Sequence, residues 1–381
     1  MHRRTAALTL ALVVVSCAGA HATCTMKIVG NDLNIDGCNV HITNGAGSTA
    51  TTNGLGNLII GYNEPRSDTT PADRAGSHNL IVGVRHHYPS YAGMALGRQN
   101  TVSGPYSSVT GGGQNTASGN RSSVSGGQNN VASGDYSSVT GGEVNQATDI
   151  ATSVVGGVDN LAGPGTRPAF PELAGSEGAH VGGGGANIAS GLVSSVSGGA
   201  GNTASGDYSS VTGGGGNMAS GENSSVSGGI LNKATDNGTS VLGGAGNVAG
   251  PGTPANVPTL SGSAGASVSG GFVNAATGLL ALVSGGDGNT ASGGESLVSG
   301  GASNTASGQY SAVSGGTGNA ASSLSASVSG GIFNVAKGGE ASSVSGGDGN
   351  TASGEGSSVS GGSFVTESTN FVWAAGSLHS P

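Results

Sequence analysis

A cluster of histidines is the most obvious candidate for metal chemistry in this chain. His86 and His87 are adjacent, and His78, Asp68 and Asp73 lie nearby in sequence. Imidazole nitrogens and carboxylate oxygens are accepted ligands of zinc. However, adjacent side chains point to opposite sides of an extended chain, and no cysteine or helical histidine spacing supports a site. We therefore interpret these residues as solvated loop residues and predict no metal ligands.

A calcium repeat is the second metal possibility. The segment Gly198 to Asn202 begins like the calcium-binding repeat G-G-x-G-x-D-x-U-x. Thr203 stands where that repeat requires Asp, and the period of this chain is fifteen rather than nine. Calcium takes six to eight oxygen ligands, usually with several carboxylates, and the 20 acidic residues are spread along the chain. The sequence predicts no calcium site.

Serine and carboxylate chemistry lacks the required arrangements. Serines are abundant, but no helix is expected that could hold a Gly-x-Ser-x-Gly nucleophile elbow. Asp287 and Asp348 stand alone at turn positions, whereas glycoside hydrolysis uses paired carboxylates. Four of the seven tyrosines share one equivalent turn position and could stack on sugars: Tyr106, Tyr136, Tyr208 and Tyr310. We predict no catalytic or cofactor-binding residues and keep carbohydrate binding as an alternative.

All of these residues belong to a tandem repeat of fifteen residues. Its unit reads Ser-Ser-Val-Ser-Gly-Gly-x-x-Asn-x-Ala-Ser-Gly-x-x, with Asn six residues after Val and Ala two residues later. Two gaps of 27 residues interrupt the series, and Met94 extends it toward the N-terminus. The repeat contains sixteen valines: Val109, Val124, Val139, Val154, Val181, Val196, Val211, Val226, Val241, Val268, Val283, Val298, Val313, Val328, Val344 and Val359.

The repeat predicts stacked parallel strands. Each half of the unit alternates inward and outward residues, which is the periodicity of a strand. A helix would not tolerate this glycine density, because each interior Gly costs about 1 kcal/mol relative to Ala. Short strands repeated at fixed spacing stack as coils about 4.8 Å apart. The sequence therefore predicts an all-β parallel solenoid, or β-roll, of about fifteen-residue coils over residues 94–362, with capped ends.

Valine, alanine and asparagine have structural roles in this prediction. The valines and alanines should fill the interior. The asparagines should stack at one level, each amide bonding the next Asn amide or turn backbone groups. The structural residues that we single out are Asn115, Asn130, Asn202, Asn217, Asn289, Val109, Val124, Val196, Val211 and Val298.

The remaining segments depart from the repeat. Loop insertions near 163–178 and 250–265 share a Gly-Pro-Gly-Thr motif, and we expect both to leave the same edge of the rod. Residues 23–93 should form an N-terminal cap and irregular first coils, in which Leu33, Ile35, Val40 and Ile42 carry a half-coil pattern. Residues 363–381 should form a C-terminal cap, in which Phe364, Phe371 and Trp373 cover the last open coil.

The N-terminus reads as an export signal. Residues 1–22 combine a basic start, a short apolar stretch and Ala20-His21-Ala22 as a cleavage site. A bacterial lipoprotein box ending at Cys17 is an alternative that would anchor the protein at the cell surface. After cleavage at Ala22 two cysteines remain, Cys24 and Cys38. In an oxidising compartment such a pair predicts a disulfide.

Composition limits the partners. Of 381 residues 78 are Gly and only 8% are charged, with a net charge of −9. Eleven prolines without a Gly-x-y period exclude collagen. The sparse acidic surface argues against nucleic acid as a partner, and no stretch is apolar enough to predict a membrane span. Because each coil buries little more than one Val and one Ala, we expect rods to self-associate.

The repeat resembles the head repeats of trimeric autotransporter (YadA-like) adhesins, most clearly in Asn115 to Gly119 and Ser122 to Gly126. That resemblance implies a left-handed β-roll, a homotrimer, a surface, matrix or glycan ligand, and secretion or cell-surface display. The chain has neither the heptad stalk nor the barrel-forming strands of that family. The expected function is a non-enzymatic extracellular structural or adhesin-like rod. Asn100 to Gly104 also resembles grass-type antifreeze β-rolls, so ice binding through the Ser/Thr face is an alternative.

Overall fold

The computed structural model describes residues 24–66, 74–163, 177–250, 264–376 and the backbone of 378–379. The expected export signal, Asp68, Asp73 and most of both loop insertions lie outside these residues. The chain divides into two units, one ending at Thr43 and one beginning at Asn44. The described residues contain no α-helix.

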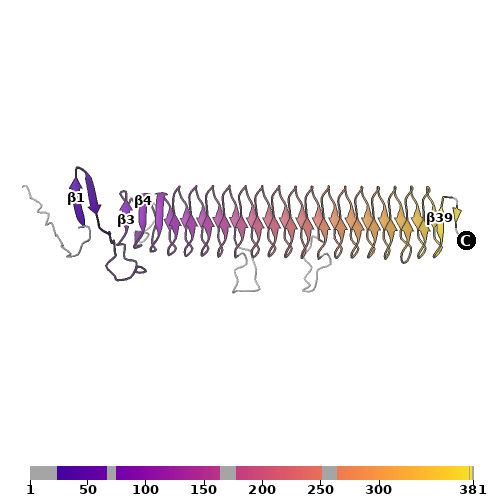
Figure 1. The fold of residues 1–381 in the computed structure, drawn as a ribbon, viewed down its shortest axis with the longest axis horizontal. Coiled ribbons are helices and arrows are strands. Elements are labelled where there is room, and N and C mark those ends of the chain that lie inside the picture. Colours follow the sequence, from indigo (N-terminus) through magenta and orange to yellow (C-terminus); the bar gives the residue numbers. More distant parts are fainter. Residues whose placement is uncertain (1–23, 67–73, 164–176, 251–263, 377, 380–381) are drawn as a thin grey trace, which may run out of the picture. The chain divides into compact units, whose positions relative to one another are not determined.

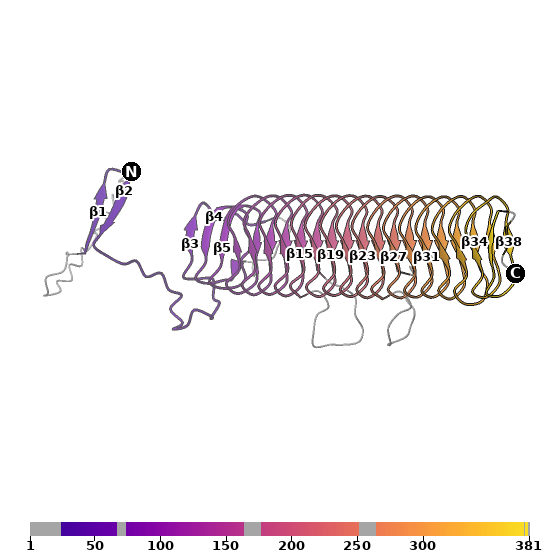
Figure 2. The same ribbon diagram turned by 45° about the vertical axis from the view of Figure 1, so that its right-hand side comes forward.

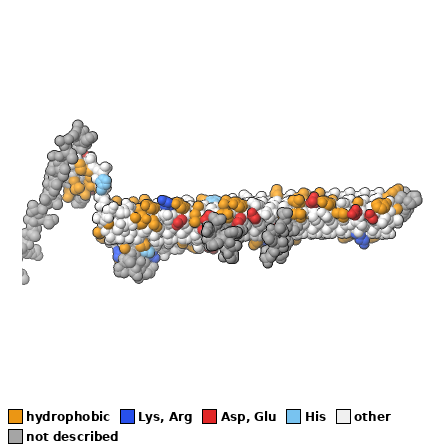
Figure 3. Space-filling view, turned by 90° about the horizontal axis from the view of Figure 1, so that it is seen from below, with side chains coloured by type: hydrophobic (Ala, Val, Ile, Leu, Met, Phe, Trp, Pro, Cys, Tyr) orange, Lys and Arg blue, Asp and Glu red, His pale blue; other side chains and the backbone are white. Residues whose placement is uncertain are grey.

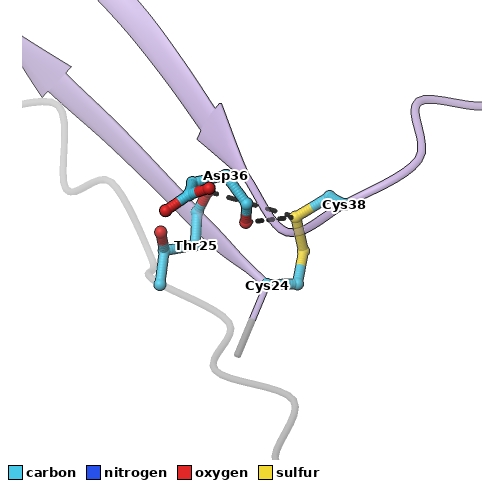
Figure 4. The surroundings of a disulfide bond; sticks show 4 residues. All are labelled: Cys24, Thr25, Asp36 and Cys38. Carbon is cyan, nitrogen blue, oxygen red and sulfur yellow. Dashed lines mark hydrogen bonds between the residues drawn. A yellow bond between two sulfur atoms is a disulfide. The ribbon is translucent and has the colours of Figure 1, made fainter. Parts of the chain in front are cut away.

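The N-terminal unit is a disulfide-closed hairpin. Strand β1 (Thr25–Val29) pairs antiparallel with β2 (Asp32–Asp36), and Cys24 is bonded to Cys38 across the open end (Figure 4). The expected half-coil is wrong, because Leu33 lies in an antiparallel strand and is exposed. The two-residue turn at Gly30, which has a φ of 63°, lets these strands pair locally.

The second unit is a parallel β-solenoid of about 18 turns of roughly 15 residues (Figures 1 and 2). One sheet, the valine sheet, contains β3 (Leu58–Ile60), β4 (Leu80–Val84), β5 (Met94–Arg98), β7 (Ser108–Val109), β9 (Ser123–Val124), β11 (Ser138–Val139), β13 (Ser153–Val154), β15 (His180–Val181), β17 (Ser195–Val196), β19 (Ser210–Val211), β21 (Ser225–Val226), β23 (Ser240–Val241), β25 (Ser267–Val268), β27 (Leu282–Val283), β29 (Leu297–Val298), β31 (Ala312–Val313), β33 (Ser327–Val328), β35 (Ser343–Val344), β37 (Ser358–Val359) and β39 (Trp373–Ala375).

The other sheet, the alanine sheet, contains β6 (Thr101–Val102), β8 (Thr116–Ala117), β10 (Val131–Ala132), β12 (Gln146–Ala147), β14 (Leu161–Ala162), β16 (Ile188–Ala189), β18 (Thr203–Ala204), β20 (Met218–Ala219), β22 (Lys233–Ala234), β24 (Val248–Ala249), β26 (Ala275–Ala276), β28 (Thr290–Ala291), β30 (Thr305–Ala306), β32 (Ala320–Ala321), β34 (Val335–Ala336), β36 (Thr351–Ala352) and β38 (Thr366–Glu367). In both sheets each strand pairs with the strands one coil before and one coil after it, as β19 pairs with β17 and β21.

The interior consists of the two inward positions of each coil. Val211 and Ala204 are fully buried, and the equivalent residues of the other coils are buried as well. Strand amides donate to the following coil, as Ser210 N does to Ser224 O at 3.0 Å. The sequence prediction of a parallel β-solenoid with valine and alanine inside is confirmed.

Each coil turns at two tips. The asparagine tip lies just before the conserved Asn, as at Gly215–Gly216, and the tyrosine tip lies just before the valine strand, as at Asp207–Tyr208. At each tip one residue has a positive φ, as Tyr208 does at 55°. This conformation turns its amide toward the preceding coil, so that Tyr208 N donates to Leu192 O. The tips therefore bond backward while the strands bond forward.

The first coils are shorter than the repeat. Ile59 pairs with Ile81, Ile81 with Ala95, and Ala95 with Val109. The valine position is thus occupied by the buried Ala95, and the prediction that Met94 extends the series is wrong by one residue. A coil of fourteen residues shifts the register without changing the pairing.

Insertions leave the stacking intact. Val154 pairs with Val181 and Val241 with Val268 despite the gaps of 27 residues. In each case the chain leaves the coil after the alanine strand (β14 or β24) and returns at the tyrosine tip, as the flanking residues show. A single extra residue between Val328 and Val344 is absorbed in the same way.

The C-terminal end differs from the expected aromatic cap. Phe364 and Phe371 lie at tips with positive φ and are highly exposed, and Trp373 begins β39. The last valine-sheet strand is instead followed by an antiparallel partner, β40 (Leu378–His379), which pairs with β39. The prediction that these aromatic residues cover the last coil is wrong, because their repeat positions face solvent.

Candidate binding surfaces of the solenoid

The conserved asparagines are buried and bond mainly to backbone. In Asn217, Oδ1 accepts a hydrogen bond from Asn232 N at 3.0 Å, and Nδ2 donates to Gly213 O at 2.8 Å and Gly229 O at 3.0 Å. Asn115, Asn130, Asn202 and Asn289 repeat this pattern.

Amide-to-amide bonds occur where Asn160, Asn247 and Asn334 donate to the preceding Asn. The prediction of a continuous amide-to-amide ladder is therefore wrong, and the alternative of bonding to turn backbone holds at most coils. Spacing alone could not choose between the two, because both place Asn at one level.

His86 takes the place of Asn at the N-terminal start of this row. Its Nδ1 accepts a hydrogen bond from Asn100 N at 3.3 Å, and its Nε2 lies 3.0 Å from Val82 O. The side chain is 2% exposed, so the interpretation as a solvated residue is wrong. Burial lowers the pKa of His86 below its ordinary value of 6.5. The shortened coil hid this equivalence, because His86 does not fall on the fifteen-residue period.

The other residues proposed for metal or acid chemistry do not converge. His78 Nε2 accepts a hydrogen bond from Asn44 N at 3.2 Å, which occupies it structurally. Among the described residues no group of three His, Cys, Asp or Glu could hold a metal ion. Asp287 and Asp348 occupy the same tip position four coils apart, which is about 19 Å. Glycosidase carboxylates lie about 5–9.5 Å apart.

Four exposed residues stack along the tyrosine tip at the N-terminal end, and we call them the tyrosine–arginine ladder: Tyr91, Tyr106, Arg121 and Tyr136. The rings of Tyr91 and Tyr106 meet edge to face with centroids 5.4 Å apart. The guanidinium carbon of Arg121 lies 5.7 Å from the Tyr106 ring and 5.3 Å from the Tyr136 ring. The sequence analysis found Tyr106 and Tyr136, but Tyr91 was hidden by the fourteen-residue coil.

The valine sheet presents a face of small hydroxyl residues. Ser195, Ser210 and Ser225 are neighbours in successive strands and are partly exposed. Residues after the valines, such as Thr212, add a second exposed row. The first row is interrupted by four other residues: His180, Leu282, Leu297 and Ala312.

The asparagine tip carries large apolar side chains in the C-terminal half, and we call this set the apolar edge: Ile230, Leu231, Phe272, Val273, Ile332, Phe333 and Phe364. All of them are exposed, and Phe333 is 63% exposed. Backbone bridges align their coils along one line, as Ile230 bridges Ala245 and Ala245 bridges Phe272. Figure 3 shows hydrophobic side chains in separate patches along the described coils, with single acidic residues between them.

Comparison with known proteins adds no relative. No protein-family model and no curated protein matches the sequence. Among the described residues, no helix has the length and apolar character needed to cross a membrane.

Proposed function

We propose that this protein is a non-enzymatic extracellular rod that attaches to surfaces or matrix, as an adhesin-like structural protein. One observation carries the proposal: the invariant residues of the repeat lie in the interior or at turns, whereas variation between coils is concentrated in exposed positions. Val211 and Asn217 are buried, while the tips carry residues as different as Tyr208, Glu295 and Phe333. Solenoids use such extended surfaces for binding.

The sequence supports the same proposal. The expected export signal would deliver the rod outside the cell, either free or anchored at Cys17. The repeat resemblance to YadA-like adhesin heads supports attachment as the role. Self-association of rods belongs to this proposal as well, because the exposed apolar edge has no covering element among the described residues.

Attachment is tested with beads that carry the mature chain, residues 23–381. Retention under flow is measured on glass, cellulose, chitin and extracellular matrix, with beads coated with an inert protein as the control. The proposal expects retention on at least one surface that withstands shear better than the control. Retention no greater than the control on every surface would contradict it.

Carbohydrate binding is a second candidate, which the tyrosine–arginine ladder favours. Exposed aromatic rings and a guanidinium next to one another combine an apolar contact with several hydrogen-bond donors. Tyr136 is 53% exposed and remains open to a ligand.

A matched pair of variants tests this candidate. Tyr136→Ala removes a member of the ladder, while Tyr310→Ala removes a tyrosine at the same tip position whose neighbouring coils carry Glu295 and Ser325. Affinity for polysaccharides, measured by glycan array and calorimetry, should fall at least tenfold in the first variant only. A wild-type protein that binds no glycan removes this candidate.

A further inference from the structure

The apolar edge has an order of large and small residues that is unusual for a solvated surface. Phe272 and Val273 stand next to each other, as do Ile332 and Phe333, so whole tips are apolar. The tips between them carry Ala, Gly, Ser, Thr or Asp. From the coil of Val211 to that of Val359 the tip pairs are Gly215–Gly216, Ile230–Leu231, Ala245–Gly246, Phe272–Val273, Asp287–Gly288, Ala302–Ser303, Thr317–Gly318, Ile332–Phe333, Asp348–Gly349 and Ser363–Phe364.

Reversing this order exchanges large for small tips. A two-fold axis between the coils of Val283 and Val298 would place the Phe272 tip opposite Thr317–Gly318. It would also place the Ile332 tip opposite Ala245–Gly246. The two outer large tips would likewise face small ones, Ile230 opposite Asp348–Gly349 and Phe364 opposite Gly215–Gly216. Every large tip of this stretch would face a small one.

A parallel arrangement at equal height lacks this fit. Each coil would then face the same coil of its neighbour, so that Phe333 would meet Phe333 while Gly318 met Gly318. Close packing requires side chains to fill the spaces left by their partners, and large tips facing one another would hold the small tips apart. The order of the edge therefore favours opposite directions over equal ones.

Charges agree with the antiparallel pairing. Lys233 is exposed in the same coil as Ile230, on the alanine sheet next to the tip. Asp348 is exposed at the tip of the coil that would lie opposite. The two-fold axis makes two such pairs of opposite charge, one at each end of the contact. At the centre, Asp287 would lie opposite Ala302–Ser303, where the Ser303 hydroxyl is a hydrogen-bond donor.

We propose that the apolar edge binds a second copy of this chain, antiparallel, about a two-fold axis between the coils of Val283 and Val298. Two-fold contacts use the same surface on both partners, and they close without growing into fibres. The insertions leave the coils at the tyrosine tip, away from this edge, as the flanking Gly163 and Gly250 show. This inference rests on the self-association in the proposed function and specifies its surface and direction.

Sedimentation of the mature chain at micromolar concentration gives the first test. We expect a dimer, and monomer for the double variant Phe272→Asn, Phe333→Asn. Asn tolerates the positive φ of Phe333. The matched control is Leu279→Asn, Leu280→Asn at the tyrosine tip, where Leu280 has a similar φ and is 57% exposed. It should remain dimeric, and circular dichroism checks that both variants fold.

Cysteine cross-linking gives the second test and separates the direction of packing from self-association. Variants Asp287→Cys and Ala302→Cys are oxidised singly and as a mixture. The antiparallel pair predicts a disulfide-linked dimer in the mixture and none in either variant alone. Cross-links in each variant alone would show parallel copies, which overturns this inference but leaves self-association standing. A monomeric wild-type chain overturns both, and a dimer without any of these cross-links overturns the proposed register. Attachment of beads is measured independently of all these outcomes.

Discussion

Replacing Asn217 with Ala tests how much the buried asparagines contribute to the rod. The substitution removes the acceptor of the Asn232 amide and the side-chain donor to Gly213 O and Gly229 O. Gly229 O keeps its hydrogen bond from Gly215 N at 2.9 Å. The Asn232 amide belongs to a fully buried residue, whereas Gly213 is partly exposed. One buried donor and one half-buried acceptor are therefore left without their partners.

The magnitude follows from the cost of unsatisfied groups. A buried backbone group without a partner costs about 1–3 kcal/mol, and water can compensate part of the loss at Gly213 O. We expect the free energy of local opening to fall by about 2–4 kcal/mol. Because about 1.4 kcal/mol corresponds to a factor of ten, amide hydrogen exchange of the flanking coils should accelerate at least ~30-fold.

Native-state hydrogen exchange with mass spectrometry is the assay, because a solenoid opens locally and each peptide reports its own coils. The matched control is Asn223→Gly, which removes an exposed amide at a tip with a φ of 56° that Gly accepts freely. The control should change exchange less than threefold. Equal exchange in wild type and Asn217→Ala would refute the reasoning, and so would an acceleration spread evenly over the whole rod.

Three further predictions concern single positions. Because burial lowers the pKa of His86 below the ordinary 6.5, the unfolded coil binds the proton more readily, and the first coils should lose exchange protection as pH falls below about 6.5; His86→Asn should abolish this dependence, and protection independent of pH in wild type would contradict it. A Cβ on Gly206 would lie 2.0 Å from Gly221 O, whereas one on Gly213 has no atom within 4 Å. Urea unfolding should therefore show a loss of about 3 kcal/mol for Gly206→Ala and a change below about 1 kcal/mol for Gly213→Ala; equal losses would be inconsistent with the stacking. Replacing Cys38 with Ser should destabilise the hairpin by about 3 kcal/mol without altering the unfolding of the solenoid, and a shift of both transitions would argue against separate units.

The sequence predicts the coil because each constraint repeats many times. A valine at one position of sixteen units and two glycines after each leave few other structures. Two short strands per coil and the direction of each side chain follow from this periodicity. The pairing of Val154 with Val181 was also predictable, since the repeat resumes in the same register after the insertion.

The errors occurred where the period changes. Coils of fourteen residues place Ala95 and His86 in positions that counting by fifteen assigns to other residues. At the ends, the hairpin of Cys24 to Cys38 and the exposed Phe364 have no repeat to define their environment. The candidate surfaces were predictable only in part, because contacts such as that of Arg121 with Tyr136 depend on which side chains stack in adjacent coils.

Spin-label distances across the valine sheet test the stacking of coils most directly. Labels are attached in pairs at Ser138 and Ser210, Ser138 and Ser240, and Ser138 and Ser343, in chains diluted with unlabelled protein. These pairs are four, six and twelve coils apart along the paired strands. With about 4.8 Å per coil, the distances should be about 19, 29 and 58 Å and lie on one line. Distances that instead count each 27-residue gap as nearly two coils, or that do not rise linearly with coil number, would contradict the account.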